Sequence, residues 1–147
     1  MASAAALRPH RGSVTASLGE PADLPFADAS FDAVLLLGPL YHLTARTDRL
    51  RALTEAVRVV RPGGPVLAAA ISRFASLLDG VTTGMLRQPA FRAIVERDVA
   101  DGQHRNPTNE PRWFTTAYFH HPRDLAEEAR AGLSPHLMMV GHRRAGG

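Results

Sequence analysis

One stretch of the sequence decides the fold: Phe31-Asp32-Ala33-Val34-Leu35-Leu36-Leu37, closed by Gly38-Pro39. Its apolar residues follow one another without alternating with polar ones. Such a run is typical of a strand that is buried on both faces, as in a parallel sheet. We therefore predict a buried strand over residues 31–37.

A helix and a second strand follow this stretch. The helix is predicted over residues 48–61, where apolar residues recur at intervals of three or four. These residues are Leu50, Leu53, Val57 and Val60. Thr47 is expected to cap the helix and Pro62-Gly63-Gly64 to end it. Residues 65–71 form another apolar run, so the order strand, helix, strand indicates a βαβ unit.

The rest of the chain predicts shorter elements on either side of this unit. A short strand is expected at Val14–Leu18. Downstream, we expect a helix over 74–86 interrupted by Gly80 and Gly84, a helix over 89–100, a loop over 101–112, an extended aromatic segment over 113–119, a helix over 122–130 and a last strand over 136–140. The fold class is α/β, with a mostly parallel sheet flanked by helices. One domain over 14–142 is predicted, between a flexible N-terminus (1–13) and a flexible tail (143–147).

Composition limits the classes of function. The 147 residues suffice for one domain, and the absence of cysteine excludes disulfides, cysteine nucleophiles and cysteine-ligated zinc. No apolar run is long enough for a membrane helix and no secretory signal is visible, so a cytoplasmic protein is expected. All 17 basic residues are arginine; they are spread along the chain, and some stand beside acids, as in Glu96-Arg97-Asp98 and Arg123-Asp124. That pattern favours a solvated surface over a nucleic-acid site, and no nucleic-acid or membrane partner is predicted.

Several kinds of catalytic site lack their motifs. The pair His120-His121 does not have the spacing of helical metal ligands, so no metal site is predicted. A G-x-S-x-G nucleophile elbow is absent, which disfavours a hydrolase. The segment Gly80-Val81-Thr82-Thr83-Gly84 lacks the lysine of a phosphate-binding loop.

The carboxyl end of the first predicted strand remains as a candidate site. Ligands of open parallel sheets bind just beyond the carboxyl ends of the strands, and here that place holds Gly38-Pro39-Leu40-Tyr41-His42. A glycine lets a ligand approach the backbone closely, while Tyr41 and His42 offer an aromatic wall and a titratable ring. The alternative interpretation is a Gly-Pro turn with Tyr41 packed under the next helix. The residues alone leave both interpretations open.

Three longer segments resemble a known family. Residues 19–34, GEPADLPFADASFDAV, resemble the pattern G-D-A-x-x-L-P-F-x-D-x-S-F-D-x-V of class I S-adenosylmethionine-dependent methyltransferases of the type 11 kind. Residues 36–43, LLGPLYHL, and residues 55–64, EAVRVVRPGG, follow the same family in order and spacing. The resemblance implies a partial Rossmann-like methyltransferase fold. It also implies S-adenosylmethionine as cofactor and a small molecule as methyl acceptor.

The resemblance assigns roles to particular residues. It implies that Glu20, Pro21, Gly38 and Pro39 contact the cofactor, with Glu20 at the adenine amino group and Gly38 near the sulfonium. Tyr41 and His42 would face the acceptor as catalytic residues, with His42 the candidate base. Two departures bear on cofactor binding: Pro21 has no backbone N–H to donate to the adenine ring, and the family's glycine-rich loop and ribose-binding acid are not found in the sequence.

These departures lead to two hypotheses about function. The first is a methyltransferase acting on a small molecule that is represented here by its C-terminal half, is impaired as this chain, and binds the cofactor weakly. The alternative is a non-catalytic remnant or interaction module that does not bind the cofactor. The strand at 31–37 should pair with 65–71 on one side. On its other side we expect Val14–Leu18 in parallel, or else a second copy in a homodimer joined edge to edge.

Overall fold

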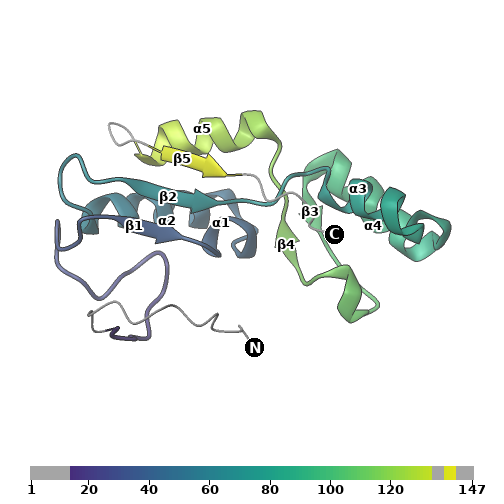
Figure 1. Ribbon diagram of the computed structural model, residues 1–147, viewed down its shortest axis with the longest axis horizontal. Coiled ribbons are helices and arrows are strands. Elements are labelled where there is room, and N and C mark those ends of the chain that lie inside the picture. The colour runs from purple at the N-terminus through teal and green to yellow at the C-terminus, as the bar shows by residue number, and fades with distance from the viewer. Residues whose placement is uncertain (1–13, 134–137, 142–147) are drawn as a thin grey trace.

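The structure, a computed structural model, describes residues 14–133 and 138–141 (Figure 1). Its elements in chain order are β1 (Val34–Leu36), α1 (Pro39–His42), α2 (Arg46–Val59), β2 (Val66–Ala69), α3 (Ala75–Thr83), the 3-10 helix η1 (Met85–Arg87), α4 (Pro89–Asp101), β3 (Gln103–His104), the 3-10 helix η2 (Pro111–Trp113), β4 (Ala117–Tyr118), α5 (Pro122–Leu133) and β5 (Met138–Gly141). None of the helices in these ranges is long and apolar enough to span a membrane.

The main sheet consists of three parallel strands in the order β1-β2-β5. Val34 of β1 lies opposite Val66 of β2, which in turn lies opposite Met138 of β5. Because α2 connects β1 to β2, the predicted strand–helix–strand unit is confirmed, and so is the mixed α/β class. β5 confirms the last predicted strand from residue 138 onward, whereas residues 136–137 lie outside the described ranges, as do 1–13 and 142–147.

The helices α2 and α5 pack together and bury most of the sheet's core. Gly132 of α5 permits this close approach, because a Cβ atom there would lie 2.7 Å from the Cβ of Leu53 in α2. The buried members of this sheet cluster are Leu36, Leu40, Leu53, Ala56, Val60, Val66, Ala68, Leu125, Ala129 and Leu133.

A second hydrophobic cluster lies beyond the carboxyl ends of β1 and β2, where Figure 1 shows α3 and α4 side by side. This helical cluster consists of Phe91, Ile94, Val95 and Trp113. The helix predicted over 89–100 is confirmed as α4. The weaker one over 74–86 ends at Gly84, which adopts a left-handed conformation (φ +76°), while Gly80 lies inside α3. Between the two clusters, β3 and β4 form a short antiparallel ladder that the sequence did not predict as such.

The first strand is shorter and less buried than predicted. Phe31 makes only an isolated bridge to Val60, and β1 begins at Val34. Leu36 is buried at 6% exposure, but its neighbours Leu35 and Leu37 are 63% and 62% exposed. The prediction of a strand buried on both faces is therefore wrong, because among the described residues the helices cover only the face that carries Leu36.

The predicted strand at Val14–Leu18 is also wrong. These residues form no strand, and the side chains of Val14 and Leu18 are 97% and 100% exposed. The segment contributes no side chain to the sheet cluster. Pairing with β1 would therefore gain no free energy from the burial of apolar side chains. Within the described chain, β1 pairs with β2 on one side and leaves its other edge unpaired.

The beginning of α2 differs from the prediction in a smaller way. Its N-cap is Ala45, which has no side chain to cap the helix, and Thr47 lies within the first turn. A side chain of the helix itself fixes the preceding turn instead. The Arg49 guanidinium donates hydrogen bonds to the carbonyls of Leu43 and Thr44 at 3.0 and 2.9 Å.

The uneven burial of β1 yields a stability prediction. Leu36→Ala removes a fully packed side chain and should lower the free energy of unfolding by about 2–5 kcal/mol. Leu35→Ala, at the next position of the same strand, should cost less than about 1 kcal/mol because its side chain is mostly exposed. Urea denaturation measures both. A Leu35→Ala loss as large as that of Leu36→Ala would show that the open face of β1 is covered in solution.

Candidate active site

Gly38 lies where β1 gives way to α1, at the carboxyl edge of the sheet. It is the N-cap of α1 and has φ −149°, a conformation that does not require glycine. A Cβ atom at this position would make only an ordinary contact of 3.5 Å, to Cδ2 of His42. Space for a Cβ atom therefore exists here, and Gly38 is half-exposed beside His42.

Tyr41 and His42 form the last turn of α1, with rings 4.7 Å apart. The Tyr41 hydroxyl donates to the carbonyl of Leu37, so Tyr41 offers its ring rather than its hydroxyl. Leu40, and not Tyr41, is the fully buried side chain of the turn. His42 is exposed, and neither of its ring nitrogens is hydrogen-bonded to another described residue. Its imidazole is therefore available to take a proton.

Glu20 and Pro21 occupy a separate turn. The Asp23 N–H donates to the Glu20 carbonyl at 3.0 Å, and the Glu20 carboxylate is exposed. Within the described ranges, no hydrogen bond or ring contact joins Glu20 or Pro21 to Gly38, Tyr41 or His42. The structure thus brings Gly38, Pro39, Tyr41 and His42 together and leaves Glu20 and Pro21 apart from them.

The segment after this turn is fastened to α2 by Glu55 and Arg58. The Leu24 N–H donates to Glu55 at 3.0 Å, and Arg58 donates to the carbonyls of Leu24 and Phe26 and to the Asp28 carboxylate at 2.7 Å. The hydrogen bonds from Arg58 and from the Leu24 N–H lower the pKa of Glu55 to about 2. Glu55 is therefore ionised at neutral pH, and it fixes the path of the chain between the turn and β1.

A buried ion pair stands behind α1. Arg49 donates two hydrogen bonds to Glu128 of α5, at 2.9 Å from Nε and 2.6 Å from Nη2. The guanidinium also lies 3.7 Å above the ring of Tyr118, and His120 Nε2 lies 3.3 Å from Glu128. Burial alone would raise the pKa of Glu128, but the hydrogen bonds from Arg49 and His120 outweigh it and lower the pKa to about 2.

Phe114 is a site residue that the sequence did not indicate. Its ring lies 6.4 Å from that of Tyr41 and 6.3 Å from that of His42, and it is inclined only 18° to the His42 ring. Its backbone has φ +63° and ψ −179°, a region that is essentially reserved for glycine. The aromatic residues of segment 113–119 are visible in the sequence. The positive φ of Phe114, however, cannot be predicted from its residue type.

A buried polar network holds the chain just before Phe114. His104 Nε2 lies 2.7 Å from the carbonyl of Trp113 and therefore donates to it, while Nδ1 lies 2.8 Å from Asp98. Ser76 donates to the same Asp98 carboxylate at 2.6 Å. Because both ring nitrogens of His104 are occupied and the residue is fully buried, the network serves to position Trp113 rather than to move protons.

No group of three or more His, Asp or Glu side chains within the described residues is arranged to hold a metal ion. The chemistry that the site offers is that of an open backbone at Gly38, aromatic rings and one free imidazole.

Comparison with known sequences identifies the family. Residues 1–68 match the family model described as a methyltransferase domain. The chain belongs to the class I S-adenosylmethionine-dependent methyltransferase family. The family resemblance of residues 19–43 and 55–64 is thereby confirmed. No solved structure matches the chain significantly.

The curated relatives of this chain differ in their stated activities. The O-methyltransferase resE of Aspergillus sclerotiorum is 32% identical over 109 residues, which cover 61% of the chain and 40% of the relative. The tRNA (carboxymethyluridine(34)-5-O)-methyltransferase of Arabidopsis thaliana is 33% identical over 105 residues, covering 69% and 24%. The probable tRNA methyltransferase 9B of Homo sapiens is 40% identical over 45 residues, covering 31% and 10%. The chain spans less than half the length of these relatives.

The ion pair behind α1 predicts how stability depends on pH. Because the pKa of Glu128 is lowered from 4.5 to about 2 in the folded protein, its stabilising contribution is full above pH 4.5 and is lost as the pH falls toward 2. Glu128→Gln leaves the Arg49 charge buried without its partner and should lower the free energy of unfolding by about 3–5 kcal/mol at pH 7. Thermal unfolding from pH 7 to pH 2 measures both. The exposed neighbour Glu127→Gln is the matched control, and an equal loss there would contradict the assignment.

The backbone conformation of Phe114 predicts an unusual order of variant stabilities. Phe114→Gly and Phe114→Ala both remove the ring, but only glycine adopts φ +63° with ψ −179° without strain. Phe114→Gly should therefore be more stable than Phe114→Ala by about 1–3 kcal/mol. Elsewhere in a folded chain alanine is usually the more stable of the two. Urea denaturation decides the order, and equal stabilities would show that Phe114 is not strained.

Proposed function

We propose that this chain forms the acceptor-facing part of an S-adenosylmethionine-dependent methyltransferase that acts on a small molecule. The observation that carries the proposal is the open backbone at Gly38 beside the free imidazole of His42, at the carboxyl edge of β1. This edge is where open parallel sheets bind their ligands.

The residues at this edge fit one end of the cofactor. A Cβ atom would fill part of the space in front of Gly38, so a glycine there suits close approach by the methionine end. Glu20 presents an exposed carboxylate that could accept from the adenine amino group, whereas Pro21 has no N–H to donate. When bound, the cofactor supplies an electrophilic methyl group. His42 would take the proton of an acceptor hydroxyl, and the ring of Tyr41 would limit how that acceptor is oriented.

Two observations support a small-molecule acceptor. Relatives named O-methyltransferases, resE at 32% and rstn1 of Aspergillus nomiae at 43% identity over 58 residues, match this chain alongside those named tRNA methyltransferases. In addition, several arginines of the described chain are paired with carboxylates: Arg49, Arg58, Arg61, Arg73 and Arg112. Paired arginines have less charge to offer to a phosphate backbone.

Cofactor binding by the isolated chain should be weak. The 147 residues contain no G-x-G-x-G loop, and each missing polar contact costs about 1 kcal/mol or more. A weak interaction is best followed residue by residue. Amide chemical shifts measured during titration with S-adenosylmethionine should move at Gly38, Tyr41 and His42, with a dissociation constant well above the micromolar range.

Gly38→Val tests the site directly. A Cβ atom at Gly38 would meet nothing closer than 3.5 Å, so we expect this variant to fold and to lose the shifts at Tyr41 and His42. Ala33→Val adds similar bulk at the other end of the strand, at an exposed position, and should leave the titration unchanged. If Gly38→Val binds as well as the unaltered chain, Gly38 is not at the cofactor site. If the unaltered chain shows no shifts at all, the non-catalytic remnant or interaction module is favoured instead.

A further inference from the structure

The rings of Tyr41, His42 and Phe114 meet beyond the carboxyl end of β1, although Phe114 is far from the other two in the sequence. Its ring stands within 6.4 Å of both, and one part of it remains in solvent, at 43% exposure for the residue. An aromatic ring that is partly exposed and held in place offers a surface on which a flat ligand can stack.

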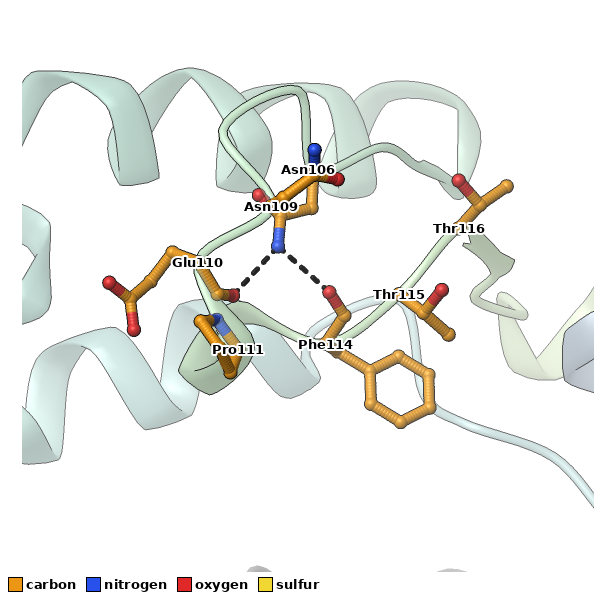
Figure 2. Close-up of a pocket in the computed structure, with 7 residues that line it drawn as sticks. All are labelled: Asn106, Asn109, Glu110, Pro111, Phe114, Thr115 and Thr116. Carbon is orange, nitrogen blue, oxygen red and sulfur yellow. Dashed lines mark hydrogen bonds between the residues drawn. The ribbon is translucent and has the colours of Figure 1, made fainter.

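The position of this ring is fixed by groups around it. Asn106 Nδ2 donates to the carbonyls of Phe114 and Glu110 at 2.9 and 2.8 Å, as Figure 2 shows. On the other side, His104 holds the carbonyl of Trp113. A costly backbone conformation persists only where its surroundings determine it, and such residues cluster at ligand-binding sites.

Phe114 also forms a wall of a hollow of about 410 Å³. In Figure 2 its ring lies at one side, below Thr115, and the loop over 106–116 surrounds the space. Thr115, Thr116 and Asn109 also line it, and their side chains are not hydrogen-bonded to another described residue. An aromatic wall with a few unengaged polar groups, at this volume, is typical of a small-molecule site.

The charge of the lining favours a neutral small molecule over a nucleic acid. Glu110 is one of the residues that line the hollow, but in Figure 2 its side chain points away from the loop, and its carboxylate accepts a hydrogen bond from Arg112 Nε at 2.9 Å, which lowers its pKa. No arginine is among the residues that line the space. Because the Glu110 carboxylate is paired with Arg112, the lining offers no unpaired positive charge to a phosphate backbone.

We propose that this hollow takes a flat phenolic ring, which stacks on Phe114 while Thr115, Thr116 and Asn109 hydrogen-bond to its hydroxyl groups. That the phenol is the methyl acceptor rests on the proposed function. That a phenol binds here does not, because it depends only on the ring, the hollow and the polar groups of this segment.

The test is a titration of the full chain with catechol, and separately with uridine 5′-monophosphate, in the absence of S-adenosylmethionine. Trp113 is the sole tryptophan and adjoins Phe114, so its fluorescence reports binding together with the amide shifts of residues 114–116. Catechol should move these signals more strongly than the nucleotide does. Phe114→Ala should weaken catechol binding about tenfold, the equivalent of a lost stacking contact of about 1.4 kcal/mol, and Phe114→Tyr should restore it.

Phe31→Ala removes another partly exposed phenylalanine, which precedes β1 in the chain, and should leave catechol affinity unchanged. An unchanged affinity in Phe114→Ala, no response to catechol, or preferential binding of the nucleotide would each overturn the proposal. Because the cofactor is absent from this titration, catechol binding by a chain that fails to bind S-adenosylmethionine would refute the proposed function and leave the phenol site standing.

Discussion

The Arg49 guanidinium lies inside the protein, held by two hydrogen bonds to Glu128 and by the carbonyls of Leu43 and Thr44. Taking two such charges out of water costs several kcal/mol for each, and the cost is offset only when their hydrogen-bonding groups are satisfied together. α2, α5 and the turn at residues 43–44 must therefore assemble as one unit. Since α1 ends immediately before that turn, the position of Tyr41 and His42 depends on this ion pair, although neither residue touches it.

The family motif also has a structural explanation. Residues 19–34 and 55–64 carry the resemblance to methyltransferases, and the structure shows that they form one hydrogen-bonded unit. Glu55 receives the Leu24 N–H, while Arg58 holds two carbonyls and the Asp28 carboxylate of the first segment. The acid and the arginine of the motif thus serve to guide the chain into β1 rather than to meet a ligand. Gly64 of the motif serves the same end, because a Cβ atom there would lie 2.8 Å from the carbonyl oxygen of Asp32.

What could be predicted from the sequence was local. The apolar stripe of α2 and the proline and glycine boundaries around it depend on neighbours three or four residues apart, so they can be read directly. Whether Val14–Leu18 pairs with β1 depends on distant residues, and apolar character alone could not decide it. The site divides in the same way. Gly38, Tyr41 and His42 follow from the end of a strand, but Phe114 adopts a conformation that phenylalanine ordinarily avoids, so rules based on residue type point away from it.

The division of the core into a sheet cluster and a helical cluster has a consequence for the site. Tyr41 and His42 belong to the sheet side, whereas Phe114 follows Trp113 of the helical cluster. The contacts in this region include the backbone bonds joining Arg73 and Ile71 to His120, the ion pair between Arg73 and Asp124 and the stacking of the Arg49 guanidinium on the Tyr118 ring. Elements of a protein differ in the free energy at which they open. The spacing of the three rings therefore depends on these joining contacts as well as on the two cores.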